Sequence, residues 1–100
     1  MSLANPSPEA RYAVQLMVTD GREREYLESY LSEASRRVEP SRLYLVPAGG
    51  TRVGVLMGAY GARADAARAL DELPEELRQF RPYVRSLDAV REDTRRALPR

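Results

Sequence analysis

The sequence predicts an α+β fold in the order β-α-β-β-α-β, with four strands in one antiparallel sheet. Two observations predict it: apolar residues alternate at period two in four short segments, and they recur at helical spacing in two longer segments between them. Right-handed crossovers then place the first and third strands in the centre and both helices on one face. This is the arrangement of ferredoxin-like and RNP-like domains, here with a short C-terminal helical extension.

Composition limits the chain to one small domain. Its 100 residues are 43% apolar, and they include neither cysteine nor histidine. This excludes a disulfide framework, a cysteine-based zinc site and the commonest general base. All 16 basic residues are arginine, yet the net charge is only +1, so a nucleic-acid partner is not predicted. No apolar run approaches the ~20 residues that span a bilayer, and no secretory signal is present.

The domain boundaries follow from local composition. Residues 1–10, with two prolines and two serines, are expected to be a disordered lead-in or a cloning remnant, and we expect the chain to be an excised domain. Residues 11–91 form the predicted domain, and residues 92–100 form a helical tail. Any membrane anchor of the parent protein is expected to lie outside this chain.

The first strand is predicted over residues 11–19 and the first helix over residues 20–37. Gln15 is the polar residue among apolar neighbours in the strand; it is either half-solvated or a hydrogen-bonding group on a binding sheet. Asp20 and Glu23 have the spacing of a capping box. The residues expected to face the sheet from the helix are Tyr26, Leu27, Tyr30, Leu31 and Ala34.

The second and third strands form a predicted hairpin. Residues 43–48 are bounded by prolines, which indicates an edge strand, and the glycine-containing turn 48–51 leads into the third strand at residues 52–60. The third strand has the sequence RVGVLMGAY. The second helix begins near Gly61 and has an apolar stripe of Ala64, Ala67, Leu70 and Leu73.

The last elements are a helical turn at residues 75–80, a strand at residues 82–87 and a short helix at residues 88–98, which we expect to be frayed or loosely packed. The sheet face away from the two main helices should therefore be open. By alternation it presents a shallow, partly apolar surface of Gln15, Met17, Arg52, Gly54, Leu56, Gly58, Tyr83 and Arg85.

Catalysis is not predicted on this face. It has no nucleophile paired with a base, no metal-ligand cluster and no pair of carboxylates, and the chain has no phosphate-binding glycine motif. No cofactor or metal is therefore expected. The adjacent acids Glu75-Glu76 and Glu92-Asp93 are interpreted as solvated charge.

The residues alone leave two binding functions open, RNA binding and protein–protein contact. RNA-recognition modules of this topology stack bases on aromatic rings of the central strands, but here the third strand has only Tyr60, at its end. Alternatively, the open face is a protein–protein or dimerisation surface, for which Met17 and Leu56 are suited because exposed apolar patches mark partner surfaces.

Two segments resemble the SPOR (sporulation-related repeat) domain family. They are YAVQLMVT at the first strand and RVGVLMGAYGARADAARAL at the third strand and second helix. Gly58-Ala59-Tyr60 matches the family's glycine-small-aromatic step, and residues 63–66 match its helix start. The tail LPEELRQFRPYVRSLDAVR is similar to a subgroup found at the C-terminus of inner-membrane cell-division proteins.

The resemblance implies a non-catalytic, peptidoglycan-binding module that recognises glycan strands lacking stem peptides. It also implies targeting of a parent envelope protein to the division septum, and a periplasmic location in an inner-membrane-anchored or exported bacterial protein. Cell-division proteins are the further partners that it implies. By family position the expected glycan contacts are Gln15, Tyr83 and Arg85. Arg52, Leu56 and Met17 are added only because alternation places them on the same face.

Overall fold

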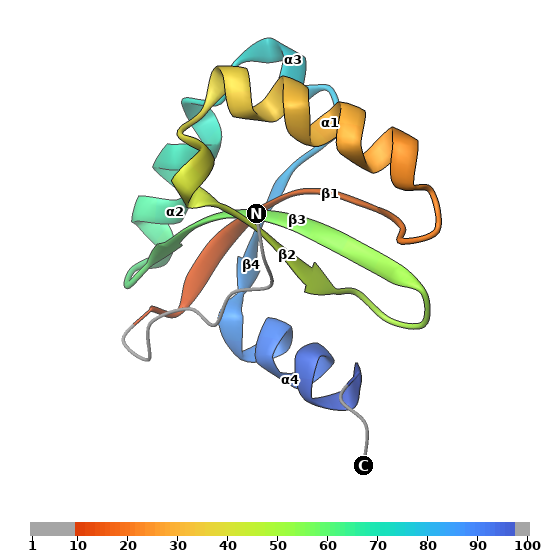
Figure 1. Ribbon diagram of the computed structural model, residues 1–100. Helices are drawn as coiled ribbons and strands as arrows, with labels where there is room; N and C mark the ends of the chain where they lie inside the picture. The colour runs from red at the N-terminus through yellow and green to blue at the C-terminus, as the bar shows by residue number, and fades with distance from the viewer. Residues whose placement is uncertain (1–9, 98–100) are drawn as a thin grey trace.

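The computed structural model describes residues 10–97 and confirms the predicted fold class. The lead-in predicted at the N-terminus lies outside the described residues, apart from Ala10. Four antiparallel strands form one sheet in the order β2-β3-β1-β4 (Figure 1), with β1 and β3 central as expected. The elements are β1 (Tyr12–Asp20), α1 (Arg24–Arg37), a one-turn 3-10 helix (Pro40–Arg42), β2 (Leu43–Pro47), β3 (Arg52–Tyr60), α2 (Arg63–Asp71), α3 (Glu75–Arg78), β4 (Tyr83–Ser86) and α4 (Leu87–Ala97).

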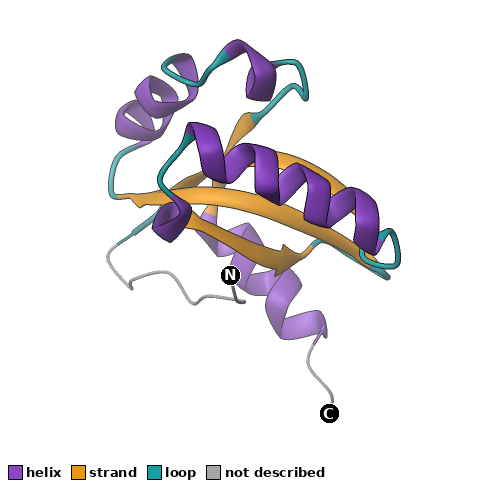
Figure 2. Ribbon diagram, turned by 45° about the horizontal axis from the view of Figure 1, so that its top comes forward, coloured by secondary structure: helices purple, strands orange, loops and turns teal. Residues whose placement is uncertain are grey.

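The helices α1, α2 and α3 lie on one side of the sheet, and α4 lies on the other (Figures 1 and 2). The side chains between the sheet and the first group form the larger core. Its buried members are Val14, Leu16, Met17, Tyr30, Ala34, Leu43, Val55, Met57, Leu73 and Leu77.

A second core lies under α4. Leu87 and Val90 of α4 are 0% and 1% exposed. They belong to a cluster with Ala10, Ala13, Tyr44, Val46 and Leu56. The expectation that this sheet face is open and that the last helix is loosely packed is therefore wrong. An i, i+3 pair of apolar residues gives α4 a buried stripe, and that stripe covers part of the face.

A β-bulge in β1 moves Met17 to the other side of the sheet. Gln15 pairs with Leu56, and the next pair in the register is Met17 with Val55, so Leu16 is the extra residue. A bulge interrupts strict alternation. Leu16 and Met17 consequently both lie in the larger core, and Met17 is 7% exposed. Its predicted place on the opposite face is wrong for this reason.

A second bulge lies in β3. Tyr12 pairs with Tyr60, but Val14 pairs with Met57, which leaves an extra residue in β3 beside Gly58. Gly58 has φ +73°, a left-handed conformation that costs other residues strain. The backbone conformation of β3 at this point therefore requires a glycine at position 58.

The start of α1 differs from the predicted capping box. The helix begins at Arg24, and its N-cap residue Glu23 makes no side-chain capping bond. Asp20 instead accepts hydrogen bonds from the backbone and guanidinium of Arg22 and from the Thr51 hydroxyl. These bonds, chiefly the one from the Arg22 side chain, hold the pKa of Asp20 well below its usual range.

Two residues predicted to face the larger core are exposed instead. Tyr26 on α1 is 48% exposed, and Ala64 on α2 is also exposed. The buried stripe of α2 begins at Ala66, two residues later than predicted.

Candidate functional site

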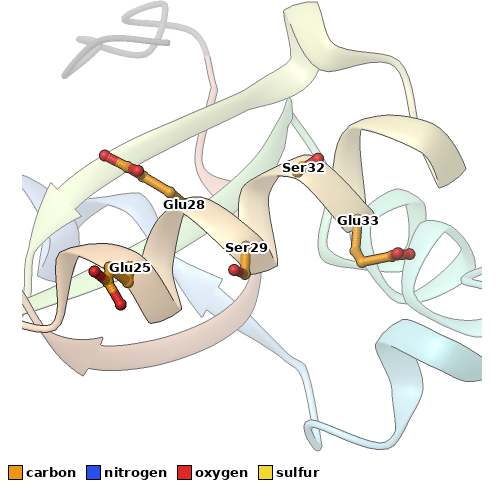
Figure 3. Close-up of a pocket in the computed structure, with 5 residues that line it drawn as sticks. All are labelled: Glu25, Glu28, Ser29, Ser32 and Glu33. Carbon is orange, nitrogen blue, oxygen red and sulfur yellow. The ribbon is translucent and has the colours of Figure 1, made fainter.

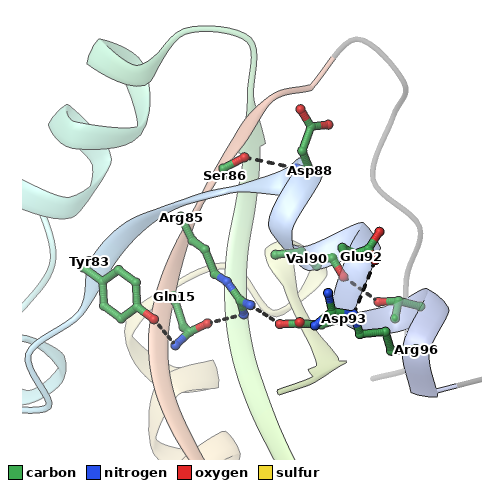
Figure 4. Close-up of polar contacts among 10 residues, drawn as sticks. Gln15, Tyr83, Arg85, Ser86, Asp88, Val90, Glu92, Asp93 and Arg96 are labelled. Carbon is green, nitrogen blue, oxygen red and sulfur yellow. Dashed lines mark hydrogen bonds and ion pairs between the residues drawn. The ribbon is translucent and has the colours of Figure 1, made fainter. Parts of the chain in front are cut away.

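Four polar side chains form one hydrogen-bonded row on the α4 side of the sheet (Figure 4). We call Tyr83, Gln15, Arg85 and Asp93 the polar row. The pairing of β1 with β4 sets Gln15 opposite Tyr83 and Ala13 opposite Arg85, so Gln15 meets both β4 side chains. Its Nε2 donates to the Tyr83 hydroxyl at 2.8 Å, and its Oε1 accepts from Arg85 Nη1 at 2.6 Å. Arg85 Nη2 also donates to the Asp93 carboxylate.

Arg85 fixes the orientation of the Gln15 amide. A guanidinium has donors and no acceptor, so it must face the amide oxygen and leave the amide nitrogen for Tyr83. Gln15 is only 3% exposed, and both ends of its amide are bonded within the row. Its place in the row is therefore that of a positioning residue, which holds the Tyr83 hydroxyl and the Arg85 guanidinium.

Tyr83 is the most accessible member of the row. It is 51% exposed, and because its hydroxyl accepts from Gln15, its own hydroxyl proton is free for an outside acceptor. A half-exposed tyrosine has an apolar ring and a polar tip. Beside it, the Arg85 side chain is 15% exposed. The row can therefore offer a ring face together with hydrogen-bond donors.

Asp93 belongs to the polar row, although its sequence context predicts only solvated charge. Its side chain is 26% exposed and pairs with Arg85. The helical spacing that buries Leu87 and Val90 continues to Asp93, three residues further on the same side of α4. That spacing is the signal that could have placed Asp93 against the sheet.

The other three predicted site residues do not join the polar row. Arg52 is exposed at the start of β3, opposite Asp20, about 13 Å along the strand from Leu56 at the usual rise per residue. Leu56 is 0% exposed beneath α4, and Met17 lies in the larger core. The dimerisation surface expected from Leu56 and Met17 is thus not accessible.

The outer surface of α1 has an acidic hollow that does not resemble a metal site. Figure 3 shows its lining: Glu25, Glu28, Ser29, Ser32 and Glu33. Glu33 is already paired with Arg36 and Arg37. Within residues 10–97, no group of histidine, cysteine or acidic side chains is arranged to hold a metal ion.

The polar row and the exposed Tyr83 ring thus lie together on one face of a ferredoxin-like sheet. The SPOR domain model matches residues 8–86, and the chain belongs to the SPOR family of peptidoglycan-binding domains. This family consists of binding domains and not of enzymes. No curated protein and no solved structure matches the chain. The family match ends at Ser86, so α4 lies outside it.

No helix among the described residues has the length and apolar character needed to cross a bilayer.

Proposed function

We propose that the polar row binds glycan strands of peptidoglycan that lack stem peptides. The observation that carries the proposal is the convergence of Gln15, Tyr83 and Arg85. The three positions come from strands at opposite ends of the sequence, and all three take part in one hydrogen-bonded row.

The chemistry of the row suits such a ligand. A glycan without its peptides is rich in hydroxyl and amide groups and apolar on the faces of its sugar rings, and it keeps a carboxylate at each place where an amidase has cut the amide bond to a peptide. The Tyr83 ring, 51% exposed, offers a flat apolar surface to a sugar face. The Tyr83 hydroxyl and the Arg85 guanidinium offer donors to its oxygen atoms.

This function places the domain in the bacterial envelope. We infer that it is a periplasmic part of an inner-membrane-anchored or exported protein, and that binding stripped glycan directs the parent protein to the division septum. Other cell-division proteins are further partners in that setting.

The test is co-sedimentation of the 100-residue chain with purified peptidoglycan sacculi. One half of the preparation is treated with an amidase that removes stem peptides, and the other half is left intact. We expect the bound fraction to rise after treatment. A chain that sediments with neither preparation contradicts the proposal.

A pair of tyrosine variants localises the binding. Tyr83→Ala removes the exposed ring of the polar row, and we expect it to abolish sedimentation with treated sacculi. Tyr26→Ala is the matched control, because Tyr26 is 48% exposed but lies on α1, on the other side of the sheet. If both variants lose sedimentation equally, or if neither loses it, the polar row is not the binding site.

A further inference from the structure

We propose that a groove between α1 and α3 binds a segment of a partner protein that has a large apolar side chain flanked by basic ones. The inference goes beyond the proposed function, because α1 and α3 lie on one side of the sheet and the polar row lies on the α4 side (Figures 1 and 2).

The groove has a volume of about 400 Å³, and we call it the aromatic groove. One wall comes from α1, and the other comes from α3 and the two residues that follow it. Arg37 joins the two walls, because its guanidinium pairs with Glu33 at 2.9 Å and with Glu76 at 3.4 Å. The lining includes Tyr26, Tyr30, Glu33, Arg37, Leu77 and Phe80.

Exposed aromatic rings gather at this groove. Among the described residues, three large hydrophobic side chains are exposed: Tyr26 at 48%, Phe80 at 37% and Tyr83 at 51%. Tyr83 belongs to the polar row, and the other two line the groove. Phe80 packs edge to face against Tyr30, with ring centroids 4.9 Å apart and planes at 88°. A preformed aromatic pocket is where anchor side chains of protein partners bind, so the groove suits one large apolar side chain.

Two polar atoms of the lining favour a peptide over a purely apolar ligand. The Tyr30 hydroxyl and Arg37 Nε are buried and have no hydrogen-bond partner among the described residues. Tyr30 as a whole is 5% exposed. A buried donor without a partner costs free energy, and a peptide supplies a carbonyl acceptor at every residue. A protein segment therefore offers both the apolar anchor and an acceptor.

The charge beside the groove favours a basic segment. The acidic hollow of α1 (Figure 3) adjoins the aromatic groove, since Ser29 and Glu33 line both. The hollow also has Glu25 and Glu28, and no basic side chain within residues 10–97 pairs with either. The whole chain has a net charge of +1, so these local acids, and not the protein as a whole, would attract a basic segment.

The experiment titrates the full 100-residue chain into two blocked peptides, Arg-Trp-Arg and Glu-Trp-Glu. The chain has no tryptophan, so the fluorescence reports on the peptide alone. We expect the emission of Arg-Trp-Arg to shift to shorter wavelength and to saturate. Glu-Trp-Glu should bind at least about fivefold more weakly, the size expected for exposed charge pairs, and high salt should reduce this difference.

Two tyrosine variants test the groove itself. Tyr26→Ala should weaken the binding of Arg-Trp-Arg by at least about tenfold, because it removes an exposed ring of the pocket. Tyr83→Ala, which removes a similarly exposed ring on the other side of the sheet, should leave peptide binding unchanged.

Tyr30→Phe tests the buried hydroxyl. It should weaken peptide binding by about twofold to tenfold, the size expected for one hydrogen bond. The free chain should be as stable as the wild type or more stable, because the lost hydroxyl has no partner there. A purely structural role would lower stability instead.

A charge variant tests the acidic hollow. Glu25→Gln combined with Glu28→Gln should abolish the preference for Arg-Trp-Arg over Glu-Trp-Glu. Asp71→Asn combined with Glu72→Gln is the matched control, because it removes two exposed acids at the end of α2. This control should keep the preference.

The outcomes separate this inference from the proposed function. The inference is overturned if neither peptide shifts at millimolar concentration, if both bind equally, or if Tyr26→Ala binds as the wild type does. If no peptide binds and Tyr26→Ala loses sedimentation with amidase-treated sacculi, the groove is a glycan site and the protein segment is the wrong ligand. A wild-type chain that sediments with neither sacculus preparation contradicts only the proposed function, because the peptide titration does not involve peptidoglycan.

Discussion

Arg85 Nη1 donates a hydrogen bond of 2.6 Å to Gln15 Oε1, between residues 70 positions apart in the chain. The contact exists because β1 and β4 pair directly, with Ala13 opposite Arg85 and Gln15 opposite Tyr83. A buried amide bonded to both an arginine and a tyrosine has a structural role, which stability measurements can test.

Gln15→Leu should destabilise the domain, because it removes both hydrogen bonds and leaves an Arg85 donor without its partner in a partly buried place. We expect a loss of about 2 kcal/mol in the free energy of unfolding, measured by urea denaturation. Tyr83→Phe should lower the free energy of unfolding by less than about 1 kcal/mol, since water can solvate the exposed end of the row. A Gln15→Leu protein as stable as the wild type would contradict the positioning role of Gln15.

The strand pattern of this fold could be predicted because alternation and turn residues are local properties. The third strand was predicted at residues 52–60 and is observed there, and the edge strand at Leu43 follows from its flanking prolines. The two bulges could not be predicted, because an extra residue in a ladder depends on the partner strand. One of them reverses the face of Met17.

The site was predicted only in part for a similar reason. Gln15, Tyr83 and Arg85 came from family positions, and the structure brings them together. Asp93 was overlooked because an acid on a short, polar helix is usually solvated. Its role depends on the docking of α4, which no single segment of the sequence specifies.

Gly58→Ala should be costly, because two effects add at this residue. Its φ of +73° is left-handed, and an added Cβ would lie 2.6 to 2.7 Å from the Tyr60 ring. We expect a loss of about 2 kcal/mol or more in unfolding free energy, measured by urea denaturation.

Two other glycines provide controls for this prediction. Gly50 has φ +57° and open space around it, so Gly50→Ala should show only the conformational cost of about 1 kcal/mol. Gly61 also has open space and no left-handed φ, and Gly61→Ala should be neutral or slightly stabilising. Equal losses of unfolding free energy in the Gly58 and Gly50 variants would show that the contact with the Tyr60 ring does not add to the cost.

Ending the chain after Ser86 should severely destabilise it, although the family match ends there. The truncation removes Leu87 and Val90 and uncovers Leu56, all of which are 0% to 1% exposed. Burying one such side chain contributes about 1.5 to 3 kcal/mol, so we expect a loss of at least about 3 kcal/mol.

Urea denaturation and size-exclusion chromatography test the truncation together. The uncovered apolar face should also make any folded fraction self-associate. A chain ending after Ala97 keeps all of α4 and should behave as the full chain does. A stable monomer ending at Ser86 would show that α4 is an accessory to the domain and no part of its core.

Tyr44 should make stability fall at alkaline pH. Burial raises the pKa of the Tyr44 phenol to about 12, against about 10 in an unfolded chain. Between these pH values the phenol loses its proton in the unfolded chain but keeps it in the folded chain. The unfolded state is therefore stabilised relative to the folded state. The stabilisation is complete below pH 10 and is lost as the pH rises toward 12, by about 2 to 3 kcal/mol in total.

Tyr44→Phe isolates this effect. At pH 7 the variant should lose about 1 kcal/mol, because the Tyr44 hydroxyl donates to the Gly58 carbonyl at 2.7 Å. From pH 10 to 12 its stability should fall less steeply than that of the wild type. Burial also raises the pKa of Tyr30, but Tyr30 is present in both proteins and cancels in the comparison. Parallel curves from urea denaturation across this pH range would show that the phenol of Tyr44 titrates alike in the folded and unfolded states.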